Sequence, residues 1–185
     1  MDSKTKQKMR LTHFVSIPLL DPVFVDYFLS LKEKVIGMHD QNDVFHPKLF
    51  QNGKHLHITL FMLDLTNAEL RSRAVDLFQA LSPDIQQILR TEGDQLQFTK
   101  LDAFKDRRDA SKGTVVYLEP TPSAGILKVA HMLIKAFVDN EILFESVFNA
   151  SHLQYNKDNQ MYSVNQYHVT VMNRSFYRPL RGGFP

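Results

Sequence analysis

The sequence has no cysteine and no tryptophan among its 185 residues. Without cysteine the chain can form neither disulfides nor thiolate metal sites. No apolar run approaches the roughly 20 residues of a membrane-spanning helix. The first ten residues are polar and basic without an apolar core, so they do not resemble a secretory signal. We therefore expect a nuclear or cytoplasmic protein that is not secreted and has no membrane partner.

The sequence also lacks a large excess of positive or negative charge. The 22 basic and 20 acidic residues leave a net charge of +2, so the whole chain is not expected to act as a polycation. The hydrophobic content of 43% is ordinary for a globular chain. We predict a flexible basic tail over residues 1–11, a single bilobal domain over 12–176 and an irregular tail over 177–185.

Two copies of a short pattern, His-x-Thr followed by apolar residues, lie far apart in the chain. The first contains His57 and Thr59, and the second contains His168 and Thr170. In a strand, residues i and i+2 share a face, so each copy should present an imidazole and a hydroxyl on one side and bury the other side. Two such faces brought together would form a cleft suited to metal-free proton transfer at a phosphate.

The pattern also has an ordinary interpretation, because one His-x-Thr in a β-rich segment carries little information. The neighbouring His55 offers a second alternative, since His-x-His also occurs in zinc sites. No third ligand stands at a recognisable spacing, so a surface or supporting role is favoured for His55. We predict no metal and no cofactor.

The rest of the chain alternates strand and helix patterns. Asp21-Pro22 predicts the start of a helix, with Gly37 as its C-cap. Thr66-Asn67-Ala68-Glu69 predicts a capping box for a helix that buries Leu70, Leu77, Phe78 and Leu81. Ser82 predicts the cap of a short helix, and Thr121-Pro122 that of another. The expected strands are 13–19, 55–64, 95–104, 114–118 and 167–172. The expected helices are 22–36, 66–81, 82–89 and 122–137. Between them we expect a charged hairpin loop at 105–109, a short extended piece at 142–148 and a polar loop at 150–159.

An approximate internal repeat follows from this order. A strand, a proline-marked cap, an amphipathic helix, a loop and a His-x-Thr strand occur over 13–63 and again over 114–172. We interpret the repeat as two lobes of similar architecture whose motif strands meet at a shared cleft.

With these residues identified, the chain resembles the 2H phosphoesterase superfamily. The resemblance rests on the stretches around His13, His57 and His168, and it is strongest toward the C-terminal domain of activating signal cointegrator 1 complex subunit 1 and weaker toward the A-kinase anchor protein 7 domain. It implies an α+β fold of two lobes, with mainly antiparallel sheets flanked by helices and one His-x-Thr strand per lobe.

The chain differs from the cointegrator pattern in two ways. No G-x-x-G loop of an RNA-binding KH module occurs, and only 13 residues follow Met172. We expect a shortened form whose second lobe has an uncovered sheet edge and whose residues 178–185 are exposed and irregular.

The resemblance also implies a chemistry. His57 and His168 would act as general base and general acid, in an order that the sequence does not give, while Thr59 and Thr170 would hydrogen-bond the phosphate oxygens. The expected function is binding or cleaving 2′,3′-cyclic or 2′,5′-linked RNA phosphodiesters within a transcription coactivator and alkylation-repair complex. The alternative is a nucleotide- or RNA-end-binding or scaffold module with little turnover. Candidate substrate contacts are Lys54, Tyr167 and Arg174, and the expected partners are RNA or nucleotide phosphate ends and cointegrator subunits.

Overall fold

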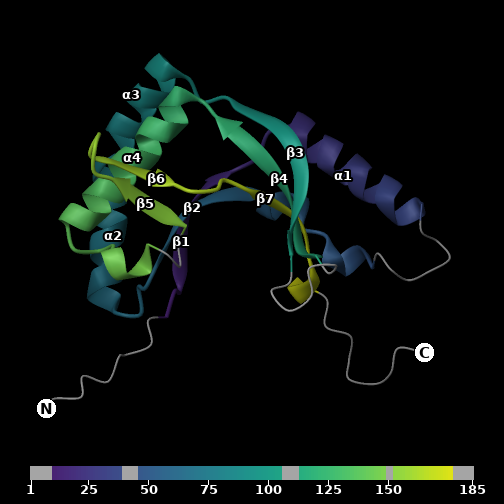
Figure 1. Ribbon diagram of the computed structural model, residues 1–185, viewed down its shortest axis with the longest axis horizontal. Helices are drawn as coiled ribbons and strands as arrows, with labels where there is room; N and C mark the ends of the chain where they lie inside the picture. The colour runs from purple at the N-terminus through teal and green to yellow at the C-terminus, as the bar shows by residue number, and fades with distance from the viewer. Residues whose placement is uncertain (1–9, 39–45, 106–112, 149–151, 177–185) are drawn as a thin grey trace, which may run out of the picture. The chain divides into compact units, whose positions relative to one another are not determined.

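The computed structural model describes residues 10–38, 46–105, 113–148 and 152–176. Five strands form one sheet in the order β1-β2-β7-β4-β3, and two more form a separate hairpin, β5-β6 (Figure 1). The strands are β1 (His13–Pro18), β2 (His57–Leu63), β3 (Leu96–Lys105), β4 (Gly113–Pro122), β5 (Leu153–Asn156), β6 (Met161–Val164) and β7 (Val169–Asn173). The mainly antiparallel sheet with flanking helices confirms the predicted α+β fold class.

The helices follow the apolar periodicity of the sequence. They are α1 (Pro22–Gly37), α2 (Ala68–Ala80), α3 (Ser82–Glu92) and α4 (Ala124–Asp139), with short 3-10 turns η1 (Pro47–Leu49), η2 (Gly53–His55), η3 (Glu145–Val147) and η4 (Arg174–Phe176). Among the described residues, no helix is long and apolar enough to cross a membrane. The Asp21 carboxylate accepts a hydrogen bond from the backbone N–H of Phe24, which confirms the predicted cap of α1.

Two compact units divide the chain. Unit 1 comprises residues 1–16, 59–97 and 122–167, and unit 2 comprises 17–58, 98–121 and 168–185. The chain passes from one unit to the other within β1, β2, β3 and β4 and again just before β7. The units therefore interleave along the sequence instead of following the two copies of the predicted repeat.

Each unit has its own apolar core. In unit 1 the rings of Phe61 and Phe137 meet edge to face, with centroids 5.3 Å apart, beside the buried Ile134. In unit 2 Phe24 of α1 stacks on Phe98 of β3 at 4.7 Å. The helix α4 buries every apolar position predicted for it: Ile126, Ala130, Leu133, Ile134 and Phe137.

Several predicted helix caps are displaced by one or two residues. Asn67, not Thr66, caps α2, because its Oδ1 accepts from the N–H groups of Glu69 and Leu70, while the Thr66 hydroxyl donates to Asp64. Gly37 is the last residue of α1 rather than its cap, which is Met38.

The same displacement affects the next two helices. Ser82 is the first residue of α3 and not its cap, since Leu81 precedes the helix without a side-chain cap. Thr121-Pro122 belongs to β4, and Ser123 caps α4.

The burial predicted for α2 is largely wrong. Ala74 is its buried residue, Leu70 and Leu77 are half-buried, and Phe78 is 39% exposed. The extended piece predicted over 142–148 contains η3, and the loop predicted over 150–159 contains β5. The predicted hairpin loop at 105–109 falls almost entirely outside the described residues, as do the residues of the predicted tail, 178–185.

One backbone contact in unit 1 requires glycine. A Cβ added to Gly125, at the start of α4, would lie 2.1 Å from the carbonyl oxygen of Gly93. Gly93 itself has φ +88°, and its carbonyl also accepts the Ser123 hydroxyl at 2.8 Å. The close approach fixes the end of α3 against the start of α4.

Candidate active site

The two motif strands are neighbours in the sheet. β2 pairs with β7 in antiparallel register, with Ile58 opposite Val169 (Figure 1). Both of these residues are fully buried, and the residues beside them along each strand are half-buried. One step back along β2 and one step on along β7, the same register places His57 opposite Thr170. Their side chains therefore leave the sheet on the same face.

The first motif is not confined to one unit. His57 lies in unit 2 together with His168 and Thr170, whereas the boundary between the units falls between Ile58 and Thr59. Thr59 stands two residues after His57 in the same strand, so its side chain leaves β2 on the same face as the imidazole. The sequence interpretation placed one motif in each lobe; instead, most of the motif residues belong to unit 2.

Just before His57 the backbone leaves the pairing with β7 for a few residues and then returns to it. The N–H of Gln51 donates to the carbonyl of Val171 at 2.8 Å, and Phe50 forms a bridge with Met172. The chain then leaves β7, makes the turn η2 and returns at Ile58. Gly53 in that turn lies close to α1: a Cβ there would come within 3.3 Å of Val25. His57 is thus the first strand residue after a turn packed against α1.

The imidazole of His57 has a defined tautomer. Its Nδ1 lies 2.7 Å from the carbonyl oxygen of His55. Because a carbonyl can only accept, Nδ1 carries a hydrogen and donates it. In the neutral ring the basic nitrogen is then Nε2, which makes His57 a suitable proton acceptor at that atom.

The imidazole of His168 lies among aromatic rings. Its centroid is 5.2 Å from that of Phe104 in β3 and 5.8 Å from that of Tyr117 in β4. Phe104 and Tyr117 stack on each other at 4.4 Å. Tyr117 is opposite Thr170 in the pairing of β4 with β7, so the second motif and the stacked rings belong to the same face of the sheet.

These two aromatic residues were not identified from the sequence. Phe104 lies at the end of β3 and Tyr117 within β4, and nothing in their local pattern distinguishes them from other core aromatics. Their place beside His168 follows from the pairing of β4 with β7, which joins residues far apart in sequence. A prediction of that register would have been needed to find them.

The three predicted substrate contacts differ in exposure. Lys54 in η2 and Arg174 in η4 are exposed, and each flanks one motif in unit 2. Tyr167 lies in unit 1 and is only 9% exposed. Burial raises the pKa of Tyr167 to about 12, and its hydroxyl has no hydrogen-bond partner among the described residues. Contact of any of the three with a substrate stays a prediction.

The zinc alternative gains no support from the described residues. Within that part of the chain, no three His, Asp or Glu side chains come together as a metal site would require. His55 is exposed, and it interacts with His57 through its backbone carbonyl instead of its imidazole. The structure thus gives His55 a backbone role beside the first motif.

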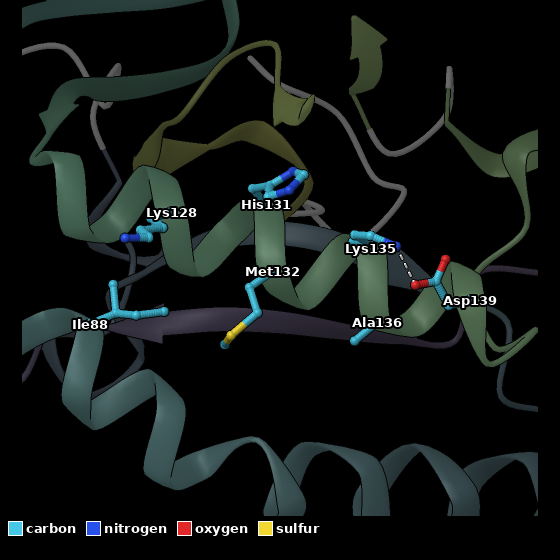
Figure 2. A pocket seen from close by; sticks show the side chains of 7 residues that line it. All are labelled: Ile88, Lys128, His131, Met132, Lys135, Ala136 and Asp139. Carbon is cyan, nitrogen blue, oxygen red and sulfur yellow. Dashed lines mark hydrogen bonds and ion pairs between the residues drawn. The ribbon is translucent and has the colours of Figure 1, made fainter. Parts of the chain in front are cut away.

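A separate cavity of about 350 Å³ lies in unit 1 between α3 and α4 (Figure 2). Apolar side chains such as Met132 and Ile88 form much of its lining. Its two ammonium groups are each paired with a carboxylate, Lys128 with Glu92 and Lys135 with Asp139. A phosphate would have to displace these carboxylates, so the cavity does not suit an anionic substrate.

Within unit 2, the neighbouring strands β2 and β7 thus bring together the imidazoles of His57 and His168 and the hydroxyl of Thr170. Imidazoles exchange protons near neutral pH, and hydroxyls can donate hydrogen bonds to an oxyanion. Such a set is suited to acid–base chemistry at a phosphodiester.

Comparison with one solved structure, the MHV ns2 PDE domain, supports the fold. The MHV ns2 PDE domain superimposes with a TM-score of 0.54 at 15% sequence identity, covering 89% of this chain and 84% of that domain. E. coli LigT in its apo form matches with a TM-score of 0.46 at 16% identity over 95% of this chain and 81% of LigT. No curated protein sequence matches.

The family comparison covers nearly the whole chain. Residues 11–179 match the AKAP7 2'5' RNA ligase-like domain, and both His-x-Thr motifs lie inside the matched region. The match includes every element from β1 to η4. The particular closeness to the cointegrator subunit that the sequence suggested stays a prediction. The chain belongs to the AKAP7 2'5' RNA ligase-like domain family of 2H phosphoesterases.

Proposed function

We propose that this protein is a metal-independent phosphodiesterase that cleaves 2′,3′-cyclic or 2′,5′-linked phosphodiesters at RNA ends. The observation that carries the proposal is the register of Ile58 with Val169, because it sets the two motifs side by side on one sheet face. Family membership supports the reaction class.

The surroundings of His57 support one assignment of roles to the two histidines. His57 holds its Nδ1 hydrogen against the carbonyl of His55, so Nε2 receives the proton of the attacking water. The bond from the water oxygen to phosphorus forms as the bond to the leaving ribose oxygen breaks. His168, as the imidazolium, protonates that leaving oxygen. The hydroxyls of Thr59 and Thr170 stabilise the charge on the non-bridging oxygens.

The test is turnover of 2′,3′-cyclic AMP and of a 2′,5′-linked adenylate dimer in excess EDTA, followed by ³¹P NMR. We expect phosphomonoester product with the wild-type protein and a bell-shaped dependence of kcat on pH. Replacing either motif histidine, as in His57→Ala or His168→Ala, should lower kcat by about 10²–10⁴-fold. The double variant should lose less than the product of the two single losses, because the residues act together.

His55→Ala is the matched control. It removes an exposed imidazole two residues from His57 but keeps the carbonyl that accepts from Nδ1. We expect near wild-type activity from it. Activity that EDTA abolishes, that zinc restores and that His55→Ala destroys would instead assign His55 and His57 to a metal.

The same protein samples also test the alternative, a module that binds nucleotides without turnover. Saturable binding of adenosine 2′-monophosphate without turnover of either substrate would contradict the enzymatic proposal and favour a nucleotide-binding role. Association with cointegrator subunits and a nuclear location stay predictions from the sequence resemblance, for which co-purification of the tagged protein is the direct test.

A further inference from the structure

We propose that Phe104 and Tyr117 are positioning residues that hold the imidazole of His168 in its reactive orientation. The inference rests on the proposed role of His168 in proton transfer, and it adds two residues outside the His-x-Thr motifs. It is carried by ring geometry and by the strand pairing that fixes the rings.

Each of the three rings contacts the other two. Phe104 and Tyr117 are stacked, with an interplanar angle of 28°. The imidazole of His168 stands at 86° to the first ring and at 69° to the second, at centroid distances of 5.2 and 5.8 Å. Since these two distances are similar, the imidazole lies beside both rings instead of continuing the stack.

This arrangement limits rotation of the imidazole. The χ2 torsion of histidine is broad in the absence of contacts, so a strand alone does not fix the ring plane. Edge-to-face contacts of aromatic rings are attractive, and here two of them act on one imidazole. Turning the ring of His168 toward the plane of the stack would disrupt both contacts at once.

The stacked rings are themselves fixed by the backbone. Tyr117 is 4% exposed, and the pairing of β4 with β7 shifts register between Val116 and Tyr117. Bulges of this kind redirect a side chain, often beside an active site. On the next strand, the carbonyl of Phe104 accepts a hydrogen bond from the Thr114 hydroxyl at 3.0 Å. Both rings are therefore held in place by the strands that carry them: β3 pairs with β4, and β4 pairs with β7.

A hydrogen bond and ring contacts thus both contribute to the orientation of the two histidines. His57 is held by a hydrogen bond to a backbone carbonyl, and His168 is held by ring contacts. Proton transfer depends on this orientation, because a displacement of about 1 Å in a catalytic group can cost about 10²-fold in rate.

The test uses Phe104→Leu, because Phe104 is half-buried and its replacement by an apolar side chain should leave the fold intact. Phe104→Tyr is the conservative variant, and Phe144→Leu is the matched control at an exposed phenylalanine of unit 1. Two readouts are measured for each: steady-state kinetics on 2′,3′-cyclic AMP in EDTA, and ¹H–¹³C NMR spectra of the imidazoles, with His168 assigned from a His168→Gln spectrum.

We expect Phe104→Leu to lower kcat by about 10–100-fold with KM changed less than about threefold. The imidazole C–H signals of His168 should move toward those of a free histidine as the ring current is lost. Phe104→Tyr and Phe144→Leu should leave both readouts close to wild type.

Unchanged His168 signals in Phe104→Leu would overturn the proposal, and so would a loss that falls on KM alone, which would indicate contact of the ring with substrate. If the wild-type protein turns over neither substrate, the proposed function fails, but the NMR comparison still decides whether Phe104 lies against the imidazole of His168, which the proposed positioning requires.

Discussion

The same side chain, histidine, is used in two opposite ways in this protein. Nδ1 of His57 donates to the carbonyl of His55, whereas Nδ1 of His131 accepts from the backbone N–H of Tyr162 at 2.9 Å. A donor at Nδ1 leaves Nε2 as the basic nitrogen, and an acceptor at Nδ1 places the hydrogen on Nε2. The neighbouring backbone group, not the residue type, therefore separates a candidate base from a structural histidine.

The threonine of the second motif gives a prediction at this scale. Thr170→Val removes the hydroxyl while keeping a β-branched side chain in β7. Because one hydrogen bond to the phosphate is lost, we expect kcat to fall by about 10–10³-fold, no more than for the histidine variants. The measurement is turnover of 2′,3′-cyclic AMP.

Thr91→Val provides the comparison for that substitution. It removes a hydroxyl in α3 that bonds its own helix at Gln87, and turnover should not change. Equal losses in Thr170→Val and Thr91→Val would show that the effect is general and not specific to the motif.

Tyr167 gives a prediction about stability. Its hydroxyl is buried and has no partner among the described residues, which typically costs about 1–3 kcal/mol. Tyr167→Phe should therefore raise the free energy of unfolding by about 1 kcal/mol, as measured from the midpoint of urea unfolding at neutral pH. A lower midpoint in Tyr167→Phe would show that the hydroxyl has a stabilising partner in solution.

The pKa of Tyr167 extends this prediction to alkaline pH. Burial raises that pKa from its ordinary value of 10.0 to about 12. Below pH 10 both the folded and the unfolded chain keep the phenol neutral, so its contribution to stability is complete. As pH rises toward 12 the unfolded chain ionises first, and wild-type stability should fall by up to about 3 kcal/mol more than that of Tyr167→Phe. Parallel pH curves for the two proteins would contradict the assignment.

At the scale of elements, the hairpin β5-β6 depends on α4. The Tyr162 backbone N–H donates to the His131 ring on α4, and the two rings stack at 6.1 Å. The ring of Tyr162 also packs against that of Tyr155 of β5, with centroids 4.7 Å apart and planes tilted by 40°, and Phe148 meets Tyr162 edge to face. A two-stranded hairpin alone is marginal in water, so these contacts with α4 account for its order.

His131 therefore offers a test of hairpin docking. His131→Leu leaves the Tyr162 N–H without its acceptor, and we expect the free energy of unfolding to fall by about 1–3 kcal/mol. His131→Asn offers a carbonyl oxygen near the position of Nδ1 and should lose less. Hydrogen exchange at Tyr162 should accelerate in the leucine variant. If both variants lose the same stability, the hydrogen bond is not the cause.

At the scale of the whole molecule, the chain passes between the two units five times, four of them within a strand. No contiguous fragment of the sequence contains either unit complete without also including most of the other unit. We therefore expect the protein to unfold in a single cooperative transition. The measurement is urea unfolding of two variants, each with one buried side chain shortened: Phe28→Ala in the core of unit 2 and Phe137→Ala in the core of unit 1.

Each truncation should cost about 3–5 kcal/mol and shift circular dichroism and tyrosine fluorescence together. Two separate transitions, with only one of them displaced by each variant, would show that the units unfold independently.

The sheet order shows which strands are the edges. The short sequence after the second motif predicted an uncovered edge in the second lobe; β7, which contains that motif, lies between β2 and β4, and the edges of the sheet are β1 and β3. The order of strands in space differs from their order in the chain, so the position of a strand in the sequence does not place it at an edge.

The amino-acid sequence by itself determined the features that depend on near neighbours. The alternation of buried and half-buried residues around His57 and His168, the helices α1 and α4, and the Asp21 cap all follow from short-range periodicity and local hydrogen bonds. These patterns also contained the family resemblance, because the two motifs are local stretches. The predicted burial of α2 was wrong because periodicity gives the apolar face of a helix but not how much of it is covered.

Only the tertiary structure decided which distant residues meet. Strand registers and ring packing bring together residues that are far apart in the sequence: Ile58 and Val169, Tyr117 and Thr170, and Phe104 and His168. A register is set by the sum of many weak contacts along two strands, and no single stretch of sequence contains that sum. For this reason the motif residues could be read from the chain, whereas the aromatic rings beside them could not.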